Sequence, residues 1–329
     1  MNLFKKLFFS VVVLGMLAAA GMAYWSKQPI TTSGNAIPFT IKSGSHLDSA
    51  VQQIASANIP VNPELLDILV RLTGKSDKLK AGSYSLKPGT TPLRLITQMV
   101  RGEFAQESLT VIEGWTFKQM RAAIAASTAL KHDTVNLSDT ELLAKITPDF
   151  TMPEGLFAPD TYLFAPGASD MQVYKQAYSL LQKRLNEAWE TRDVASLPYK
   201  TPYEALIMAS IVEKETGRKA ERTNIAGVFI NRLRLGMLLQ TDPTVIYGMG
   251  DKYDGKIYKR DLTTDTPYNT YTRAGLPPTP IALPGEESLH AAMNPAKTDA
   301  LYFVAKGDGS SHFSNNLSEH NQAVNRYQR

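Results

Sequence analysis

Residues 201–217 read TPYEALIMASIVEKETG, and this stretch decides the fold of the larger part of the chain. The Thr-Pro-x-Glu pattern at 201–204 is a capping box with proline at the first helical position. It predicts a helix over 203–216 that Gly217 ends in a left-handed conformation. Apolar side chains point in nearly every direction around the axis over 206–212, so we expect this helix to be buried on most sides.

The last turn of that helix carries two carboxyl groups, Glu213 and Glu215. Burial and the negative end of the helix dipole both disfavour a charged carboxyl, so both raise its pKa toward the range useful to a general acid. Two residues along a helix are about 200° apart, so the pair cannot flank one sugar as two glycosidase carboxylates do. Periodicity does not choose between them, and either could instead form an ion pair with Arg218, Lys219 or Arg222.

Beyond a second helix predicted over 220–235, the chain becomes polar and rich in turns. Tyrosine, asparagine, glutamine and threonine recur there, and they offer flat rings for sugar faces and hydrogen-bonding groups for sugar hydroxyls. The alternative is that Asn and Pro only shape the turns. We predict a sugar-binding cleft, shared with Glu215, that is lined by Gln240, Asp242, Thr244, Tyr247, Asn269 and Tyr271.

The N-terminus carries Lys5 and Lys6 before an uncharged, apolar run over 7–25. At about 1.5 Å per residue this run matches a hydrocarbon core of about 30 Å. The lysines predict a single-pass anchor in the cytoplasmic (inner) membrane, with residues 1–6 in the cytoplasm and the body outside it. The alternative is a signal peptide cleaved near 21–23. The length of the run and the interfacial pair Tyr24-Trp25 favour a retained anchor.

The remaining patterns predict an α+β fold with a polar linker over 26–36, a small unit over 37–107 and a large catalytic domain over 108–329. The small unit has the order strand, helix, helix, strand. Its opening, FTIKSGSHLDSAVQQIA at 39–55, is similar to a LysM module, a class that commonly binds glycans containing N-acetylglucosamine. The closing strand lacks the usual LysM ending, so a scaffold that binds no sugar is the alternative. The expected elements are strands at 38–41, 82–86 and 108–112, helices at 47–57, 63–72, 92–102, 116–126 and 171–190, and a loop rich in aromatic residues at 153–167.

The composition of the chain argues against nucleic-acid binding, cysteine chemistry and metal binding. The 329 residues have a formal net charge of +4, too small to argue for nucleic acid, and we expect no nucleic-acid partner. The absence of cysteine excludes disulfides, thiolate metal sites and a cysteine nucleophile. The five histidines lack the close spacing of metal ligands, so we predict neither a metal site nor a cofactor.

Four segments carry a family resemblance. The long stretch IMASIVEKETGRKAERTNIAGVFINRLRLGMLLQTDPTVIYGMG, at 207–250, is followed by YNTYTRAGLPPTPIALPG, AAMNPAKTDALYFVAKGDGSSHF and SEHNQAV. Together they closely resemble the endolytic murein transglycosylases, the MltG or YceG-like family. Several long motifs in the right order are more specific than any short pattern, and the likeness covers nearly the whole chain.

The resemblance implies a lyase that cuts nascent peptidoglycan strands internally between N-acetylmuramic acid and N-acetylglucosamine. It leaves 1,6-anhydro-muramoyl ends and terminates strand elongation beside the peptidoglycan synthases. The family's catalytic residue is the second glutamate of Glu-x-Glu, which is Glu215 here, and His312 and His320 match family positions. His312 joins the predicted cleft on that ground.

One carboxyl is enough for this reaction, because the sugar's own C6 hydroxyl is the nucleophile. Two other interpretations stay open at this point. One is a glycoside hydrolase in which Asp242 or another acid activates water. The other is a wall-binding membrane anchor of the synthesis machinery that has no activity of its own.

Overall fold

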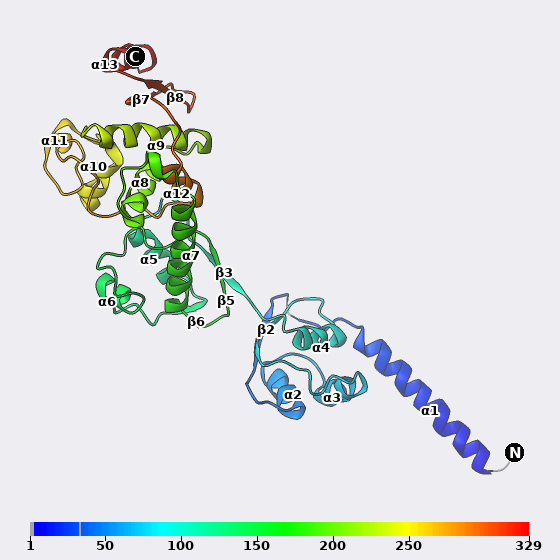
Figure 1. Cartoon of the computed structure of the whole chain (residues 1–329). Coiled ribbons are helices and arrows are strands. Elements are labelled where there is room, and N and C mark those ends of the chain that lie inside the picture. Colours follow the sequence, from blue (N-terminus) through cyan, green and yellow to red (C-terminus); the bar gives the residue numbers. More distant parts are fainter. Residues whose placement is uncertain (1–2, 33, 329) are drawn as a thin grey trace. The chain divides into compact units, whose positions relative to one another are not determined.

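The structure is a computed structural model and describes residues 3–32 and 34–328. The chain forms two compact units, Met1–Glu107 with Phe164–Pro166 and Ser108–Leu163 with Gly167–Arg329. Both units mix helices with short strands (Figure 1), which confirms the predicted α+β class.

The first unit contains a two-stranded antiparallel sheet, β1 with β2, in which Ile37 pairs with Leu86 and Ile41 with Gly82. One face of the sheet turns Phe39 and Tyr84 into a core that the helices complete, and these two rings stack at 5.3 Å. The predicted order of strand, helix, helix and strand is therefore confirmed, while the relation to LysM modules stays a prediction. Its elements are α1 (Leu3–Ser26), β1 (Ile37–Ile41), α2 (Leu47–Ser56), α3 (Pro63–Leu72), β2 (Gly82–Leu86) and α4 (Pro92–Arg101).

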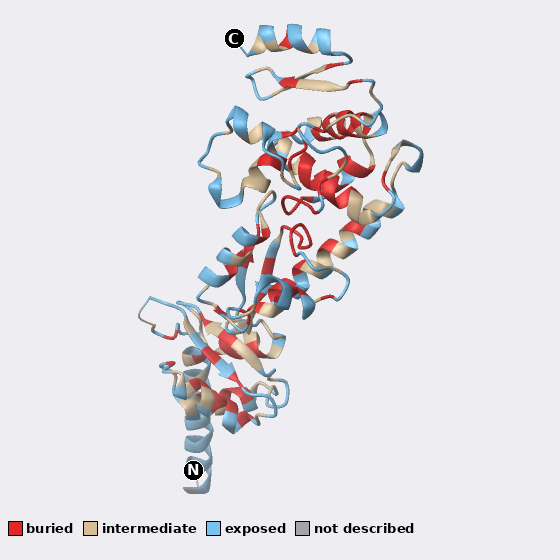
Figure 2. Ribbon diagram, turned by 90° about the vertical axis from the view of Figure 1, so that its left-hand side faces the viewer, coloured by how far each residue is buried: buried red, intermediate tan, exposed pale blue. Residues whose placement is uncertain are grey.

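Helix α1 is exposed along most of its length, as Figure 2 shows near the N-terminus. Residues Phe4–Ser26 are long and apolar enough to cross a membrane, with a mean hydropathy of 2.1. Its last turns differ, because Met22 and Trp25 pack against the core of the first unit. The predicted linker is also partly packed: Ile30 is buried, and its N–H donates to the Thr90 carbonyl at 2.8 Å.

The second unit is built mainly from helices. Strand β3 pairs with β5, β4 pairs with β6 in parallel, and β7 forms an antiparallel hairpin with β8. The helices are α5 (Phe117–Ala126), α6 (Asp139–Ala144), α7 (Asp170–Glu190), α8 (Pro202–Glu215), α9 (Lys219–Arg234), α10 (Asp242–Met249), α11 (Lys259–Thr263), α12 (Glu286–Met293) and α13 (Leu317–Tyr327). Short 3-10 turns lie at Val194–Ser196 and Gly250–Lys252. The strands are β3 (Glu107–Thr110), β4 (Leu130–Lys131), β5 (Thr161–Phe164), β6 (Ala168–Ser169), β7 (Tyr302–Ala305) and β8 (Ser311–Ser314).

Helix α8 is the centre of this unit, and every residue over 205–212 is buried. Helices α7, α9, α10 and α12 all pack against it. Even its polar Ser210 is fully buried, because the hydroxyl donates to the Ile207 carbonyl and accepts the N–H of Ile281 at 3.0 Å. The predicted burial of this helix on most sides is therefore confirmed.

The predicted ends of α8 are right at its start and wrong at its finish. Thr201 caps the helix by accepting the Glu204 N–H at 3.2 Å, but the Glu204 carboxylate accepts from Lys200 instead of closing the capping box. At the other end Thr216 is extended, with φ −144° and ψ 133°. Gly217 is not in the left-handed region, because the Thr216 hydroxyl turns the chain by accepting the N–H of Arg218 at 3.0 Å.

The aromatic segment over 153–167 is also more ordered than predicted. Its last part forms β5, and Phe157, Tyr162 and Phe164 are buried. Phe157 stacks on Phe117 at 5.2 Å. These rings anchor the segment to the core, so they present no open face to a sugar.

Candidate active site

The last turn of α8 sends its two carboxyl groups into different surroundings. Glu213 and Glu215 lie two residues apart, which separates their directions by about 200°. Both belong to the helix, but their hydrogen-bond partners come from different segments of the second unit.

Glu213 is held by structural contacts. Its side chain is 5% exposed and pairs with the equally buried Arg222 of α9 at 3.1 Å. Its other oxygen accepts the Gly285 N–H at 3.0 Å and the Ser288 hydroxyl at 2.7 Å. This glutamate therefore ties the end of α8 to α9 and to the start of α12, and its charge is compensated.

Glu215 has a different set of neighbours. Its Oε2 accepts one hydrogen bond, from the Thr241 hydroxyl at 2.7 Å. Burial raises the pKa of the Glu215 carboxyl, and the negative charge of Asp242 raises it further. The Thr241 hydrogen bond and the positive charge of Arg232 oppose this rise without cancelling it. The result is a carboxyl that keeps its proton to a higher pH than an ordinary glutamate.

The segment that faces Glu215 is held in place by threonine hydroxyls. Gln240 has φ 50°, a left-handed conformation that costs a non-glycine residue about 1 kcal/mol. Its N–H donates to the Thr270 carbonyl at 3.1 Å, and the next N–H, of Thr241, donates to the Thr270 hydroxyl at 3.1 Å. Thr244 adds a hydroxyl contact to Thr270 at 2.8 Å. This bonding fixes the turn that aims the Thr241 hydroxyl at Glu215.

Two further groups lie in the electrostatic field of Glu215. Asp242 is exposed and accepts the Tyr271 hydroxyl at 2.6 Å. Arg232 is 8% exposed, and its guanidinium donates to the Leu301 carbonyl at 2.7 Å and to the Leu239 carbonyl at 2.9 Å. Burial lowers the pKa of Arg232, while the nearby Glu215 raises it. The Glu215 carboxyl is thus exposed to the negative charge of Asp242 on α10 and to the positive charge of the buried Arg232 on α9.

A third buried carboxyl, Glu154, escaped the sequence predictions. Its side chain accepts the Phe117 N–H at the start of α5 at 2.9 Å and the Tyr247 hydroxyl of α10 at 3.2 Å. Burial raises the pKa of Glu154 to about 7. Tyr247 in turn packs edge-on against Tyr268 at 4.8 Å. The signal in the sequence was a single glutamate inside the otherwise apolar stretch 153–159.

Comparison with known proteins identifies the family of the chain. The model of the YceG-like family matches residues 39–326, which include Glu154, Glu213, Glu215 and the hydrogen-bond partners described above. The chain belongs to the YceG-like family. The sequence-based resemblance is therefore confirmed.

Relatives of known name support the same family. The chain is 35% identical over 314 residues to the endolytic murein transglycosylase of Bacillus subtilis strain 168, covering 90% of this chain and 86% of that protein. It is 25% identical over 355 residues to the protein of the same name from Streptococcus pneumoniae strain D39, of whose length it spans 63%. The structure of this chain also matches the 2.6 Å crystal structure of a YceG-like protein from Listeria monocytogenes. The two have a TM-score of 0.57 and 30% sequence identity. That match covers 88% of this chain and 99% of the other.

In this YceG-like chain the predicted cleft residues separate into three groups. Gln240, Asp242 and Tyr271 belong to the segments around Glu215, and Gln240 and Asp242 are exposed. Thr244, on α10, and Asn269, in the loop that follows α11, are both buried. The Asn269 amide donates to three backbone carbonyls, so its side chain shapes the loop and has no N–H left for a sugar.

The last two cleft candidates lie with other partners. Tyr247 is bound to Glu154, as described. His312 is on β8 and contacts the Tyr327 ring at 5.8 Å, while His320 stacks on Tyr302 at 5.1 Å. Burial lowers the pKa of His320, and the charge of Arg232 adds to the effect. His320 and the Arg232 guanidinium both contact the Tyr302 ring.

The chemistry available at the site follows from these contacts. Within residues 3–32 and 34–328, no three His, Asp or Glu side chains group closely enough to hold a metal ion. Glu215 has a raised pKa, so it can donate a proton. It also has a hydroxyl and a cation beside it that stabilise the carboxylate left behind. A group with these neighbours can act first as an acid and then as a base.

Proposed function

We propose that this chain is an endolytic murein transglycosylase, which cuts peptidoglycan strands internally between N-acetylmuramic acid and N-acetylglucosamine. The observation that carries the proposal is the contrast at the end of α8. Glu213 is neutralised by Arg222, whereas Glu215 has a pKa raised by burial and by Asp242. The names of the bacillar and pneumococcal relatives agree with this activity.

The proposed reaction uses one carboxyl twice. The protonated Glu215 donates its proton to the glycosidic oxygen while the bond from that oxygen to C1 of the muramoyl residue breaks. The C6 hydroxyl oxygen of the same residue then bonds to C1, and its proton passes to the Glu215 carboxylate. The products are a 1,6-anhydro-muramoyl end and a free N-acetylglucosamine end, and Glu215 regains its starting state.

The residues around Glu215 have roles in both halves of this cycle. Before cleavage, burial and the charge of Asp242 favour the protonated form of Glu215. After the proton has left, the Thr241 hydroxyl and the charge of Arg232 stabilise the carboxylate until the C6 hydroxyl gives its proton back. Exposed polar groups near this carboxyl, from Gln240, Asp242 and Tyr271, are the proposed sugar contacts.

The cellular setting is part of the proposal. Helix α1 is long and apolar enough to cross a bilayer, and Lys5 and Lys6 favour a cytoplasmic N-terminus. The catalytic unit would then work outside the cytoplasmic membrane, where nascent strands leave the peptidoglycan synthases. Retention of α1 in the mature protein is checked by the intact mass of membrane-extracted protein.

Product analysis tests the reaction. The full chain is incubated with purified peptidoglycan, and the released fragments are examined by mass spectrometry. We expect anhydro-muramoyl ends, which are one water lighter than reducing ends. Reducing ends would show a hydrolase in which Asp242 or another acid activates water. Intact strands, with a folded protein, would show a binding protein without activity.

A further inference from the structure

The C-terminal end of helix α1 and the residues that follow it pack directly against the rest of the first unit. Met22 and Trp25 pack against the unit's core, Ser26 is buried, and the backbone of Ile30 is bonded to that of Thr90 at 2.8 Å. Helix α1 contacts both α3 and α4. The helix and the unit therefore move as one piece at this junction.

The length of the apolar helix fixes where a membrane would end. A hydrocarbon core of about 30 Å takes about 20 residues of helix, which places its outer boundary near Trp25 when it begins at Leu7. Lipid headgroups extend a further 5 Å or more, roughly, beyond that boundary. Because Trp25 already packs on the unit, the side of the unit around α1 falls within the headgroup layer.

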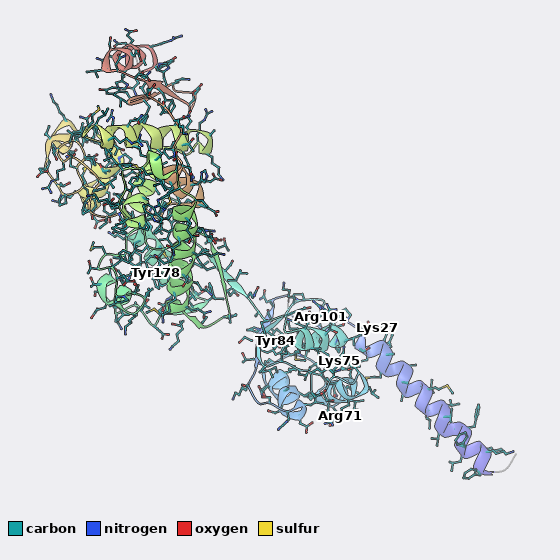
Figure 3. The ribbon with its side chains drawn as sticks, viewed as in Figure 1. Lys27, Arg71, Lys75, Tyr84, Arg101 and Tyr178 are labelled. Carbon is teal, nitrogen blue, oxygen red and sulfur yellow. The ribbon has the colours of Figure 1, made fainter. Side chains whose placement is uncertain are left out.

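The elements that contact α1 carry groups that suit a membrane surface, and one of these elements is α3. Ile68 and Leu72 are one turn apart on α3 and are 44% and 71% exposed. Lys27 follows α1 directly, and Lys75 follows the left-handed Gly74 that ends α3. Figure 3 shows Lys27, Lys75, Arg71 and Arg101 on the side of the unit from which α1 leaves.

The helix dipole explains the basic residues at the helix ends but not the exposed apolar residues beside them. Basic residues complement the dipole at the C-terminal ends of α3 and α4, so Arg71 and Arg101 need no lipid to account for them. Arg71 is moreover paired with Asp48 and Asp67 at 2.8 and 2.7 Å. The dipole does not explain why two large apolar side chains lie exposed beside these charges. Apolar groups flanked by lysines are the pattern of surfaces that lie in a bilayer interface.

We propose that the face formed by Lys27, Ile68, Leu72 and Lys75 docks on the surface of an anionic phospholipid membrane. Ile68 and Leu72 enter the headgroup layer, and the basic side chains bind lipid phosphates. The proposal rests on α1 spanning the bilayer, as proposed above, and is independent of the reaction at Glu215. Docking fixes the orientation of the first unit to the membrane, so that unit stands as a rigid base at the wall side of the bilayer.

The absence of cysteine in the chain makes a direct test simple. The full chain with Leu72→Cys, carrying a nitroxide label, is placed in bilayer nanodiscs that contain anionic phospholipid. Collision rates with oxygen and with a water-soluble nickel reagent give the depth of the label. The matched control is Thr40→Cys, because Thr40 is exposed on the face of the sheet opposite the helices. We expect the Leu72 label to favour oxygen and the Thr40 label to favour nickel.

The charge contribution is tested with Lys27→Gln/Lys75→Gln. Each basic residue near an anionic surface strengthens binding about fivefold, so losing both lowers the ratio of docked to undocked unit about twenty-fivefold. A control that removes two charges from the exposed side of α7, Lys175→Gln/Lys183→Gln, should leave the Leu72 label unchanged. Nanodiscs of purely zwitterionic lipid should weaken docking in the same way as the Lys27/Lys75 variant.

Two results would overturn the proposal. If the chain inserts in the nanodiscs and the Leu72 label is as exposed to nickel as the Thr40 label, the docking is wrong and the anchor stands. If the chain does not stay with the nanodiscs, both the anchor and the docking are wrong. Neither result changes the products formed from peptidoglycan, so the proposed reaction is judged separately.

Discussion

The two sides of the last turn of α8 carry the same residue type at a similar depth, and their partners make them different. On one side Glu213 meets a buried guanidinium, a backbone N–H and a hydroxyl. On the other side Glu215 meets one hydroxyl and a nearby anion. Burial alone therefore does not identify an acid. What distinguishes the proposed acid is burial without a directly paired cation.

Glu154 provides a third case. It is as buried as Glu213, but its partners are a backbone N–H and a tyrosine hydroxyl, and burial raises its pKa to about 7. Its bonds join α5 to α10, and its partner Tyr247 belongs to the helix that begins at Asp242 beside Glu215. We interpret Glu154 as a positioning residue, since it reaches the site only through α10.

The largest effect is expected from Glu215→Gln. The amide keeps the shape of the side chain and can still accept the Thr241 hydrogen bond, but it has no proton to transfer. General acid and base catalysis contributes about 10²–10⁴-fold, so release of anhydro-muropeptides should fall at least a hundredfold. The thermal melt should be unchanged or slightly higher at neutral pH, because a carboxyl whose pKa is raised by folding destabilises the folded state once it ionises. A folded variant that cuts at the wild-type rate would disprove the mechanism.

Glu213→Gln should reverse the pattern, with a large effect on stability and a smaller one on activity. The substitution removes the carboxylate at 3.1 Å from the buried Arg222 and leaves it with Glu113 at 3.9 Å, so we expect a loss of about 3 kcal/mol of unfolding free energy, the lower end for breaking a buried pair. The matched control is Glu287→Gln on α12, whose pair with Lys219 at 3.8 Å is exposed and should contribute less than about 1 kcal/mol. Denaturant melts compare the two. Equal stability losses would mean that the buried Glu213–Arg222 pair contributes no more to the unfolding free energy than the exposed Glu287–Lys219 pair.

Glu154→Gln should remove a pH dependence of stability. The folded pKa of about 7 lies above the ordinary 4.5, so the folded state holds the proton more tightly and stability falls as pH rises between these values. A pKa shift of this size corresponds to about 3 kcal/mol of unfolding free energy. The wild-type protein should lose this amount between pH 4.5 and 8, and the variant should not. Melts of both proteins from pH 4.5 to 8 measure the difference. Parallel curves would show that Glu154 titrates normally.

The smallest effects are expected from the neighbours of Glu215, and they have opposite signs. Thr241→Val removes a hydrogen bond that favours the carboxylate, so the pKa of Glu215 should rise. Asp242→Asn removes a repelling charge, so that pKa should fall. The protonated form starts the reaction, so the alkaline limb of the kcat/KM profile should move up for the first variant and down for the second, each by less than about one pH unit.

Shifts in the same direction would contradict this account of the two neighbours. A complete loss of cutting in the folded Asp242→Asn protein would point instead to Asp242 as a base that activates water. The product ends of the residual activity separate these outcomes, since a hydrolase leaves reducing ends.

The sequence predicted local structure well where the cause is local. Thr201, Pro202 and the apolar run that follows predict the start and the burial of α8, and both are confirmed. The end of the helix was mispredicted because the Thr216 hydroxyl, rather than Gly217, turns the chain. Glycine permits a left-handed end but does not require one.

The choice between Glu213 and Glu215 could not be made from helical spacing. It depends on residues such as Thr241 and Gly285, which are distant in sequence. The prediction of cleft residues was weak for a related reason. A polar side chain such as that of Asn269 is as useful to the loop's own backbone as it would be to a sugar, and composition does not distinguish the two uses.

The contacts that assemble the site close long stretches of chain. Thr241 is 26 residues from Glu215, Gly285 is 72 from Glu213, and Tyr247 is 93 from Glu154. Contacts of long sequence separation cost more loop-closure entropy than local ones, and chains rich in them fold more slowly. A partly folded chain would hold helix α8 without the surroundings that raise the pKa of Glu215. The site is therefore complete only when segments far apart in the sequence have come together around the end of α8.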